Sequence, residues 1–455
     1  MSVKEEREKK IFMSAAEEMY EELRHWRTEH PKASFDEIAD RITPPRRALM
    51  GQLISQLAHQ HGDGEVLEGV RCERCGEEMA YKGKPERGVE HREGEGKLKR
   101  AYYYCAQCKT GFFPLDEQLQ VGEHSWSPGT VKQMVKLGVE IPSYRRAAVN
   151  YTELTQVGVS KSKLADLVKE YGGKVVAVQE AEAEAMVKPP AKDEVVTERE
   201  MPQPDSEVMA VSMDGAMVNI RGEGWKEVKT VTISAVEREP NAETGEPEVH
   251  LTRHSYRSGL WEAKTFAHHQ WAEGYRRGLE RATQIVSVND GAAWIWAIVL
   301  MCWAPCVQIL DWWHVVEKLW AAAAVIGDHD PLLTARWMKT HKAHLWSSQL
   351  RPILHAIRLA CPRGQPLPEP VRVAVSYLFH HRHRMHYQAF RLAGYPIGSG
   401  TVESACKLVM QERMKQAGMR WSRDGAQAML ALRSILLSER WDEVWPSLTP
   451  SSNLS

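Results

Sequence analysis

The sequence lacks a long apolar run and has almost no net charge. Its longest apolar stretch, 294–310, is interrupted by Pro305, and no apolar run with a basic leader opens the chain. We therefore expect no membrane-spanning segment, no membrane partner and a cytoplasmic protein. The 59 Lys and Arg nearly balance the 60 Asp and Glu, which argues against a general coat for nucleic acid. Any DNA binding would have to depend on local basic patches.

The length of the chain predicts several domains. Its 455 residues, of which 43% are hydrophobic, exceed the roughly 250 to 300 residues at which a single core stops growing. No internal repeat of solenoid length is visible. Changes in composition instead divide the chain into seven segments, which are 1–65, 66–120, 121–172, 173–205, 206–330, 331–395 and 396–455.

The first and fourth of these segments carry no predicted chemistry. Apolar positions in 1–65 have the spacing of amphipathic helices, which predicts a helical hairpin or a partner-binding arm. Segment 173–205 is acidic and contains prolines, so we interpret it as a linker that follows a short helix.

Cysteine is scarce, but four of the eight cysteines lie in two close pairs. The pairs are Cys72-Glu-Arg-Cys75 and Cys105-Ala-Gln-Cys108. Two CxxC pairs separated by a loop can place four thiolates around one tetrahedral ion, and a chain without a secretion signal favours metal over disulfide. Four protein ligands leave no position for water, so we predict structural zinc in a four-cysteine zinc ribbon over 66–120. Four buried cysteines in a small β module are the alternative.

A pair of helices is predicted after the cysteine segment. The first covers 144–155, the turn has Gly158 at its corner, and the second covers 160–171. We predict a helix-turn-helix DNA-binding region in which Lys161 and Lys163 face the groove. An ordinary helical domain explains the same pattern about as well.

Short apolar runs beyond the linker predict a mixed sheet. The runs 208–213, 218–220 and 228–236 are predicted as antiparallel strands, the last two joined across the turn Gly222-Glu-Gly224. The runs 285–288 and 307–310 are each followed by helix-favouring sequence, which is typical of buried strands with βα connections. Three hairpin strands followed by alternating strand and helix predict an RNase H-like α/β core. Segment 331–395 is predicted to be helical throughout.

Three acidic residues stand where such a core could bind metal ions. Asp214 follows the predicted strand 208–213, Asp290 ends the next run, and Glu403 lies in the first turn of a helix opened by Gly398-Ser-Gly400. Phosphoryl transfer is well served by two divalent cations roughly 3.5 to 4 Å apart, which need several carboxylates. We therefore predict that these three acids hold two Mg²⁺ or Mn²⁺ ions. Singly, each acid could equally belong to a turn or to a helix start.

Four motifs resemble those of a known family. Met213-Asp-Gly-Ala216, Val288-Asn-Asp-Gly-Ala-Ala-Trp294, Leu310-Asp-Trp-Trp-His314 and Gly398-Ser-Gly-Thr-Val-Glu-Ser404 are similar to motifs of ISKra-type insertion-sequence transposases. The resemblance covers nearly the whole chain, including the cysteine pairs and the string Gly111-Phe-Phe-Pro-Leu-Asp116 after them. It implies a DDE transposase with an RNase H-like core and a helical insertion before the final Glu. It also implies metal-binding roles for Asp214, Asp290 and Glu403.

Further residues are predicted to support the three acids. Asp311 and His314 form a DxxH element that is similar to a motif bordering the active site of transposases with a helical insertion. His can bond phosphate or orient a carboxylate at neutral pH, and a helix cap pair is the alternative. A basic aromatic stretch beyond Glu403 is predicted to contact the DNA ends, although a solvated face is the default for any one residue. Its members are Lys407, Arg413, Lys415, Arg420 and Trp421.

Together these features predict an enzyme that acts on double-stranded DNA. It is expected to be a nucleoid-associated transposase that cleaves element ends and joins them to target DNA by two-metal-ion phosphoryl transfer. Holding two ends together favours a homo-oligomer on DNA. The alternatives are a zinc-containing DNA-binding regulator derived from an inactive transposase, and a structure-selective nuclease on the same core.

Overall fold

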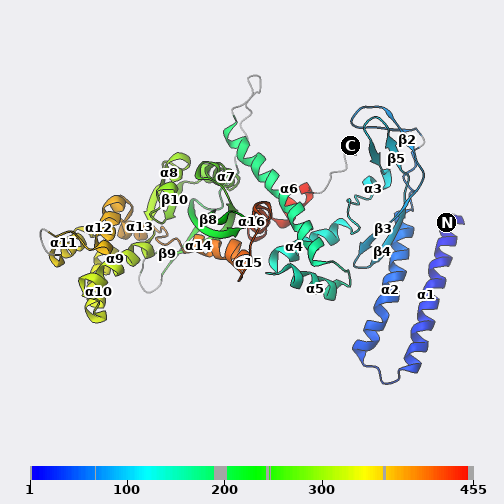
Figure 1. Ribbon diagram of the computed structural model, residues 1–455, viewed down its shortest axis with the longest axis horizontal. Helices are drawn as coiled ribbons and strands as arrows, with labels where there is room; N and C mark the ends of the chain where they lie inside the picture. Colours follow the sequence, from blue (N-terminus) through cyan, green and yellow to red (C-terminus); the bar gives the residue numbers. More distant parts are fainter. Residues whose placement is uncertain are drawn as a thin grey trace. The chain divides into compact units, whose positions relative to one another are not determined.

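The computed structural model describes residues 3–66, 68–188, 202–241, 245, 247–361 and 365–448. The chain divides into two compact units, Met1–Leu167 with Glu443–Ser455 and Val168–Asp442, and each unit contains helices and strands (Figure 1). The protein is thus of the multidomain α+β class that the sequence predicted. No helix within the described residues is long and apolar enough to cross a membrane.

The first unit begins with helices and continues with short strands. Its elements are, in chain order, α1 (Val3–Glu29), α2 (Phe35–Ala58), β1 (Val70–Arg71), β2 (Glu78–Tyr81), β3 (Glu86–His91), β4 (Gly94–Lys99), β5 (Tyr103–Cys105), β6 (Thr110–Phe112), α3 (Pro114–Gln118), α4 (Pro128–Glu140) and α5 (Tyr144–Thr155).

Helices α1 and α2 occupy the segment in which helical spacing was predicted. Ser34 and Glu37 form a reciprocal capping box that starts α2. Helix α2 packs on the β3–β4 hairpin so closely that a Cβ on Gly51 would lie 2.4 Å from the carbonyl oxygen of Glu95. Only glycine permits this approach of helix to strand.

The cysteine segment forms a sheet of its own, in the order β1-β2-β5-β6. Its core is small, with Val70, Met79, Ala101 and Tyr103 buried beside two of the cysteines. So little apolar burial is typical of modules that depend on a metal ion for stability.

Helix α6 (Lys161–Val187) departs from the prediction. It begins where expected, with the Ser160 hydroxyl accepting a hydrogen bond from the Lys163 amide at 3.1 Å, but it continues far beyond residue 171. Residues 173–187 are therefore helix rather than linker, while 189–201 lie outside the described residues. The reason is a buried face that the acidic composition concealed, since Val175, Gln179 and Ala183 recur every four residues and are all buried.

The turn before α6 also differs from the prediction. The left-handed residue that ends α5 is Gln156, with φ of 62°, and Gly158 has open space around it. The corner thus does not depend on a glycine.

The second unit is built on a long mixed sheet. After α6, its elements are β7 (Val208–Ile220), β8 (Gly224–Pro240), β9 (Pro247–Gly259), α7 (Ala263–Arg276), η1 (Leu279–Arg281), β10 (Gln284–Asn289), α8 (Ala293–Cys302), β11 (Val307–Leu310), α9 (Trp312–Ile326), α10 (Pro331–Trp346), α11 (Leu350–Ala360), α12 (Glu369–His381), η2 (Arg382–Arg384), α13 (Tyr387–Leu392), α14 (Gly400–Ala405), η3 (Cys406–Gln411), α15 (Glu412–Met414) and α16 (Arg423–Leu437). Helix α17 (Trp441–Leu448) begins at the end of this unit.

The strands of this sheet have the order β11-β10-β7-β8-β9. Strands β7, β8 and β9 pair antiparallel, whereas β10 pairs parallel with both β7 and β11. The separate strands predicted at 208–213 and 218–220 are wrong, because both belong to the single strand β7. The third antiparallel strand is β9, which the sequence did not predict because its apolar positions are few and interrupted by charged residues.

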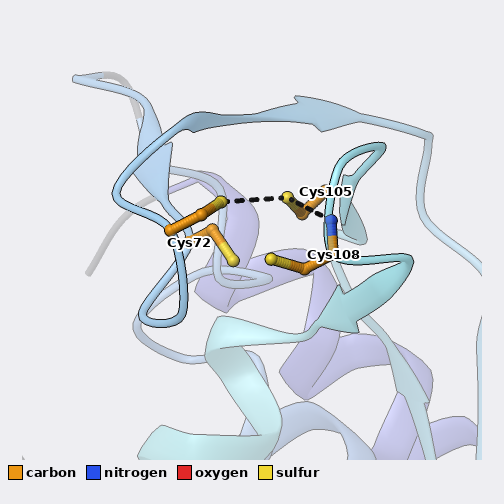
Figure 2. A group of neighbouring side chains, drawn as sticks. Cys72, Cys105 and Cys108 are labelled. Atoms are coloured by element: carbon orange, nitrogen blue, oxygen red, sulfur yellow. Dashed lines mark hydrogen bonds between the residues drawn. The ribbon is translucent and has the colours of Figure 1, made fainter.

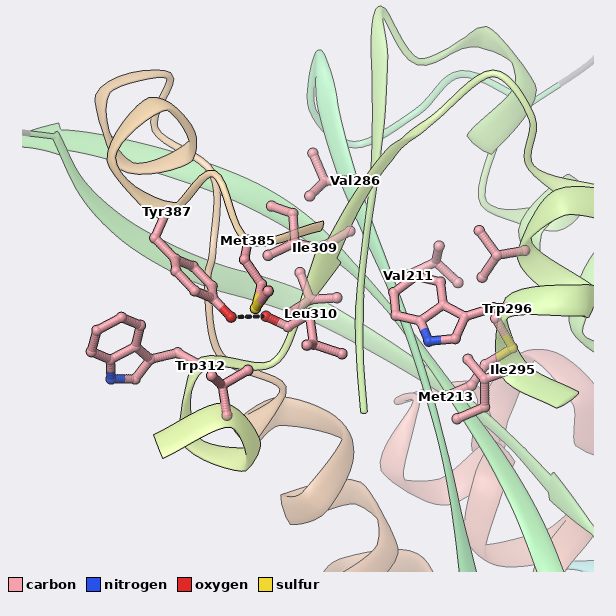
Figure 3. Packing of buried hydrophobic residues seen from close by; sticks show 14 of the residues in the cluster. Val211, Met213, Val286, Ile295, Trp296, Ile309, Leu310, Trp312, Met385 and Tyr387 are labelled. Carbon is pink, nitrogen blue, oxygen red and sulfur yellow. Dashed lines mark hydrogen bonds between the residues drawn. The ribbon is translucent and has the colours of Figure 1, made fainter. Parts of the chain in front are cut away.

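Apolar side chains from the sheet and its helices form the core of the second unit (Figure 3). Trp296 of α8 is buried together with Val211 and Met213 of β7. Tyr387 of α13 is fully buried, and its hydroxyl donates to the carbonyl oxygen of Leu310 at 3.0 Å. The helical segment between β11 and α14 is thus anchored directly to the sheet.

Candidate functional site

The four paired cysteines come together in the first unit (Figure 2). Their sulfur atoms all lie within 4.8 Å of one another, and those of Cys75 and Cys105 are 3.6 Å apart. One pair follows β1 and the other begins at the end of β5. The predicted four-cysteine cluster is confirmed, and its geometry is compatible with a zinc site.

Left-handed residues bring each cysteine pair into position. Gly76 directly follows the first pair with φ of 75°, and Lys109 follows the second with φ of 54°. The Gly76 amide donates to the carbonyl oxygen of Cys72 at 2.7 Å. Each pair is thus held in a tight turn that directs both thiols to the same point.

The pKa values of neighbouring thiols in the cluster are shifted in opposite directions. Backbone hydrogen bonds from Arg74 and Cys75 lower the pKa of Cys72 to about 6, whereas hydrogen bonding with Cys75 and burial raise the pKa of Cys108 to about 12. Such divergence arises because neighbouring thiols cannot all ionise without a positive charge between them. A zinc ion would stabilise all four thiolates, and the complete set of protein ligands favours a structural role.

The acids of the second unit lie at one end of the parallel part of the sheet. Asp290 follows β10 directly, as predicted. Asp214 is not at a strand end, because β7 continues past it and pairs it with Thr230 of β8. The parallel pairing of β7 with β10, however, stops at Val211 and Ser287. Asp214 is therefore beyond the end of that ladder although it is inside a strand.

Asp311, His314 and Glu403 form the tightest group of these side chains. One ligand atom from each lies within 4.8 Å of the others. Asp311 starts α9, where one of its carboxylate oxygens accepts from the His314 amide at 2.8 Å and lies 3.0 Å from His314 Nδ1. Its other oxygen accepts from the amide of Ser399, whose hydroxyl donates to Glu403 at 3.5 Å. The DxxH element is thus a helix cap and a neighbour of Glu403 at once.

Asp214 and Asp290 interact with this group electrostatically. Burial raises the pKa of Asp214, and the charges of Asp290 and Glu403 raise it further. Asp290 and Glu403 also contribute to the raised pKa of His314. Among the described residues, however, neither Asp214 nor Asp290 belongs to the three-residue group whose ligand atoms meet within 4.8 Å.

The Asp311–His314 pair favours its charged form. Burial alone would raise the pKa of Asp311, but hydrogen bonds from His314 and Ser399 outweigh burial and lower it. The hydrogen bond with Asp311 is the main reason why the pKa of His314 is raised. At neutral pH this imidazole is consequently a better hydrogen-bond donor than an isolated histidine.

Negative charge at this place exceeds positive charge. Four carboxylates lie here, those of Asp214, Asp290, Asp311 and Glu403. Within the part of the chain that the structure describes, the one ion pair that they form is between Asp311 and His314. Asp214 and Asp290 are partly buried, whereas Glu403 is exposed. A partly buried carboxylate without a cationic partner is costly unless a cation binds or a proton is taken up. Oxygen ligands of this kind are those preferred by Mg²⁺ and Mn²⁺.

Two residues near the acids were missed by the sequence analysis. Asn289 is the last residue of β10 and is buried. Tyr377 of α12 packs on Gly291, since a Cβ there would lie 2.2 Å from its ring. Burial and then the charge of Asp290 raise the pKa of this tyrosine, so α12 reaches the acids. The motif Asn289-Asp-Gly291 contained Asn289 and the glycine on which Tyr377 packs, but the sequence alone gave neither position a role.

Part of the predicted DNA-contact set is buried. Arg413 is 1% exposed, with its guanidinium 5.4 Å from the ring centre of Trp421. The indole N–H of Trp421, itself 8% exposed, donates to the carbonyl oxygen of Met414 at 3.2 Å. The burial of both side chains argues against the predicted contacts of Arg413 and Trp421 with DNA. The cause is main-chain pairing of Trp421 with Asn219 at the end of β7, which turns the indole inward.

The other predicted DNA contacts stay accessible. Lys407, Lys415, Arg420 and Lys161 are exposed, and Lys163 is partly exposed. Accessibility allows phosphate contact but does not establish it.

A family model described as an uncharacterised protein family (UPF0236) matches residues 47–339, which is more than half of the chain. The chain belongs to this family. No curated protein matches the chain. The range matched in this UPF0236 protein includes the four paired cysteines and Asp214, Asp290, Asp311 and His314, and it ends before Glu403.

Proposed function

We propose that this UPF0236 protein is a DNA transposase of the DDE type. Asp214, Asp290 and Glu403 would hold two Mg²⁺ or Mn²⁺ ions, with Asp311 and His314 beside them. The observation that supports the proposal is that the charges of Asp290 and Glu403 both raise the pKa of Asp214 and that of His314, next to the hydrogen-bonded group of Asp311, His314 and Glu403. The strand order β11-β10-β7-β8-β9 supports an RNase H-like core with a helical insertion.

The residues present suit phosphoryl transfer between DNA strands. Divalent cations held by Asp214, Asp290 and Glu403 would lower the pKa of a nucleophilic water or 3′-hydroxyl and would stabilise the leaving oxygen. Asp311 holds Nδ1 of His314, which leaves Nε2 to donate to a phosphate oxygen. Ser399 supports Glu403 from the preceding turn. No covalent enzyme intermediate is required.

The first unit would supply recognition of the DNA. Its zinc ribbon would be structural, and α5 and α6 would form the helix-turn-helix, with Lys161 and Lys163 near the start of the second helix. The proposed partners are transposon ends and target DNA. Phosphate contacts of this kind position the protein, while base contacts would specify the sequence.

The test is a supercoiled plasmid that carries the DNA flanking the gene, incubated with the protein and Mg²⁺ or Mn²⁺. We expect nicking at discrete positions followed by joining to a target. Asp290→Asn is expected to abolish both steps and to keep DNA binding, whereas the matched change at exposed Asp328 leaves all three intact. Binding without nicking would favour the DNA-binding regulator, and nicking without joining would favour a structure-selective nuclease.

A further inference from the structure

Strands β7 and β10 separate where the acids begin. Their parallel pairing runs from Val208 and Gln284 to Val211 and Ser287 and then stops. Beyond this point β7 continues in its pairing with β8 alone. A continued ladder would join the two strands by main-chain hydrogen bonds at a spacing of about 4.8 Å. Beyond Ser287 a side chain, that of Asn289, makes the link instead.

The side chain of Asn289 crosses the space between the separated strands. Its amide oxygen accepts a hydrogen bond from the backbone N–H of Met213 at 2.6 Å. Its amide nitrogen donates to the hydroxyl of Ser287 at 2.8 Å. Asn289 is completely buried, where an unmade hydrogen bond costs about 1 to 3 kcal/mol. The contact with Met213 is therefore a strong constraint on the geometry of β7.

The main chain of Asn289 forms a hydrogen bond with a third segment, the start of α9. Its carbonyl oxygen accepts from the amide of Asp311 at 2.8 Å. One residue thus contacts the neighbour of Asp214 through its side chain, precedes Asp290 in the chain, and bonds Asp311 through its backbone.

We propose that Asn289 is a positioning residue that sets the spacing of the carboxylates of Asp214, Asp290 and Asp311. The proposal rests on the proposed function, because it assigns these carboxylates to a shared set of cations. Asparagine suits the role since it offers an acceptor to Met213 and a donor to Ser287. Aspartate would keep the acceptor and lose the donor, and leucine, of similar size, would lose both.

The experiment compares Asn289→Leu and Asn289→Asp with the wild-type chain. Gln284→Leu is the matched control, since it removes an amide from the other end of the same strand, where Nε2 donates to the carbonyl oxygen of the adjacent Ile285. Three quantities are measured: hydrogen exchange of the Met213 amide, Mn²⁺ affinity by electron paramagnetic resonance, and single-turnover nicking. Exchange at Met213 reports the contact without any metal or DNA.

Asn289→Leu is expected to speed exchange at Met213 and to weaken Mn²⁺ binding, each about tenfold or more, as a loss of roughly 1.4 kcal/mol implies. Gln284→Leu is expected to leave both within about twofold. Asn289→Asp keeps the acceptor and is expected to keep the Met213 amide protected from exchange. This variant tests the contact if the leucine variant does not fold. A loss of protection in Asn289→Asp would overturn the proposal.

The outcomes separate this proposal from the proposed function. Wild-type protein that binds no Mn²⁺ would defeat the two-metal function, and exchange at Met213 would still be informative. Unchanged Met213 exchange in a folded Asn289→Leu variant would defeat the positioning role. Mn²⁺ affinity equal to that of wild type in this variant would defeat it as well, even if the plasmid assay succeeds.

Discussion

Replacing Glu273 with glutamine is expected to destabilise the second unit by roughly 3 kcal/mol at neutral pH, as expected for a buried ion pair that loses one partner. Glu273 of α7 is 1% exposed and lies among three arginines. Its carboxylate forms an ion pair with Arg276 in the same helix, lies 3.6 Å from Arg257 of β9, and lies 3.9 Å from Arg440. The cluster thus ties a helix to the edge strand of the sheet.

The magnitude follows from the pKa of Glu273. Burial alone would raise this pKa, but the charges of Arg276 and Arg257 outweigh it and lower the pKa from 4.5 to about 2. At 1.36 kcal/mol per pKa unit, this difference corresponds to roughly 3 kcal/mol. Breaking a buried ion pair by removing one partner commonly costs about 3 to 5 kcal/mol, so the two arguments agree.

Because folding lowers the pKa of Glu273, the stability that its carboxylate contributes depends on pH. Because the folded-state pKa of Glu273 is lower than the unfolded value, its stabilisation is complete above pH 4.5 and is lost as pH falls toward 2. The difference between wild type and Glu273→Gln is thus expected to be full at pH 7 and to shrink by more than half at about pH 3.

Urea unfolding followed by tryptophan fluorescence measures this difference, since most of the 16 tryptophans lie in the second unit. Glu207→Gln, at an exposed position of the same unit, is the control and is expected to change little. A loss at pH 7 that persists unchanged at pH 3, or no loss at pH 7, would refute the reasoning.

Three further predictions concern metal, histidine and DNA. Cys105→Ser is expected to remove zinc, measured by atomic absorption, and to unfold the ribbon, because structural zinc supplies roughly 10 to 16 kcal/mol; a folded ribbon without zinc would contradict this. Asp311→Asn is expected to lower the pKa of His314 in an NMR titration, since Asp311 is the main cause of its elevation; an unchanged value would contradict that cause. Lys415→Ala is expected to weaken DNA binding and reduce its salt slope by about 0.9 without loss of stability, whereas Arg413→Ala is expected to destabilise the second unit by about 1 to 3 kcal/mol because its side chain is buried. Equal stability losses in the two variants would count against this distinction.

Features that depend on local spacing were predictable from the sequence. The two CxxC pairs indicated four converging thiols, and helix α5 has the predicted bounds. Strands β10 and β11 were also expected, because a short apolar run followed by helix-favouring sequence is typical of a buried strand in a βα unit.

Features that depend on distant partners were not predictable. Helix α6 continues past residue 171 because its apolar face, sparse in sequence, is buried and because Glu182 pairs with Arg257. Strand β7 passes through Asp214 because β8 supplies a long antiparallel partner. Nothing near Arg413 in the sequence indicated that Trp421 would fold back onto it.

In the candidate site, too, some residues could be predicted from local motifs and others could not. The positions of Asp290 and of the Asp311–His314 pair followed from motifs, because each acid is next to a strand or at a helix start. Asn289 and Tyr377 could not be assigned, because their roles arise from a gap between two strands and from packing on Gly291. Local motifs identify acids, whereas only the fold identifies what holds them.

The most direct test of the central claim is anomalous diffraction from crystals of the wild-type chain soaked in Mn²⁺. The account predicts two manganese peaks roughly 3.5 to 4 Å apart, contacted by Asp214, Asp290 and Glu403, and fewer peaks in Asp290→Asn. A single site held by Asp311, His314 and Glu403 alone, or no manganese near these residues, would contradict it.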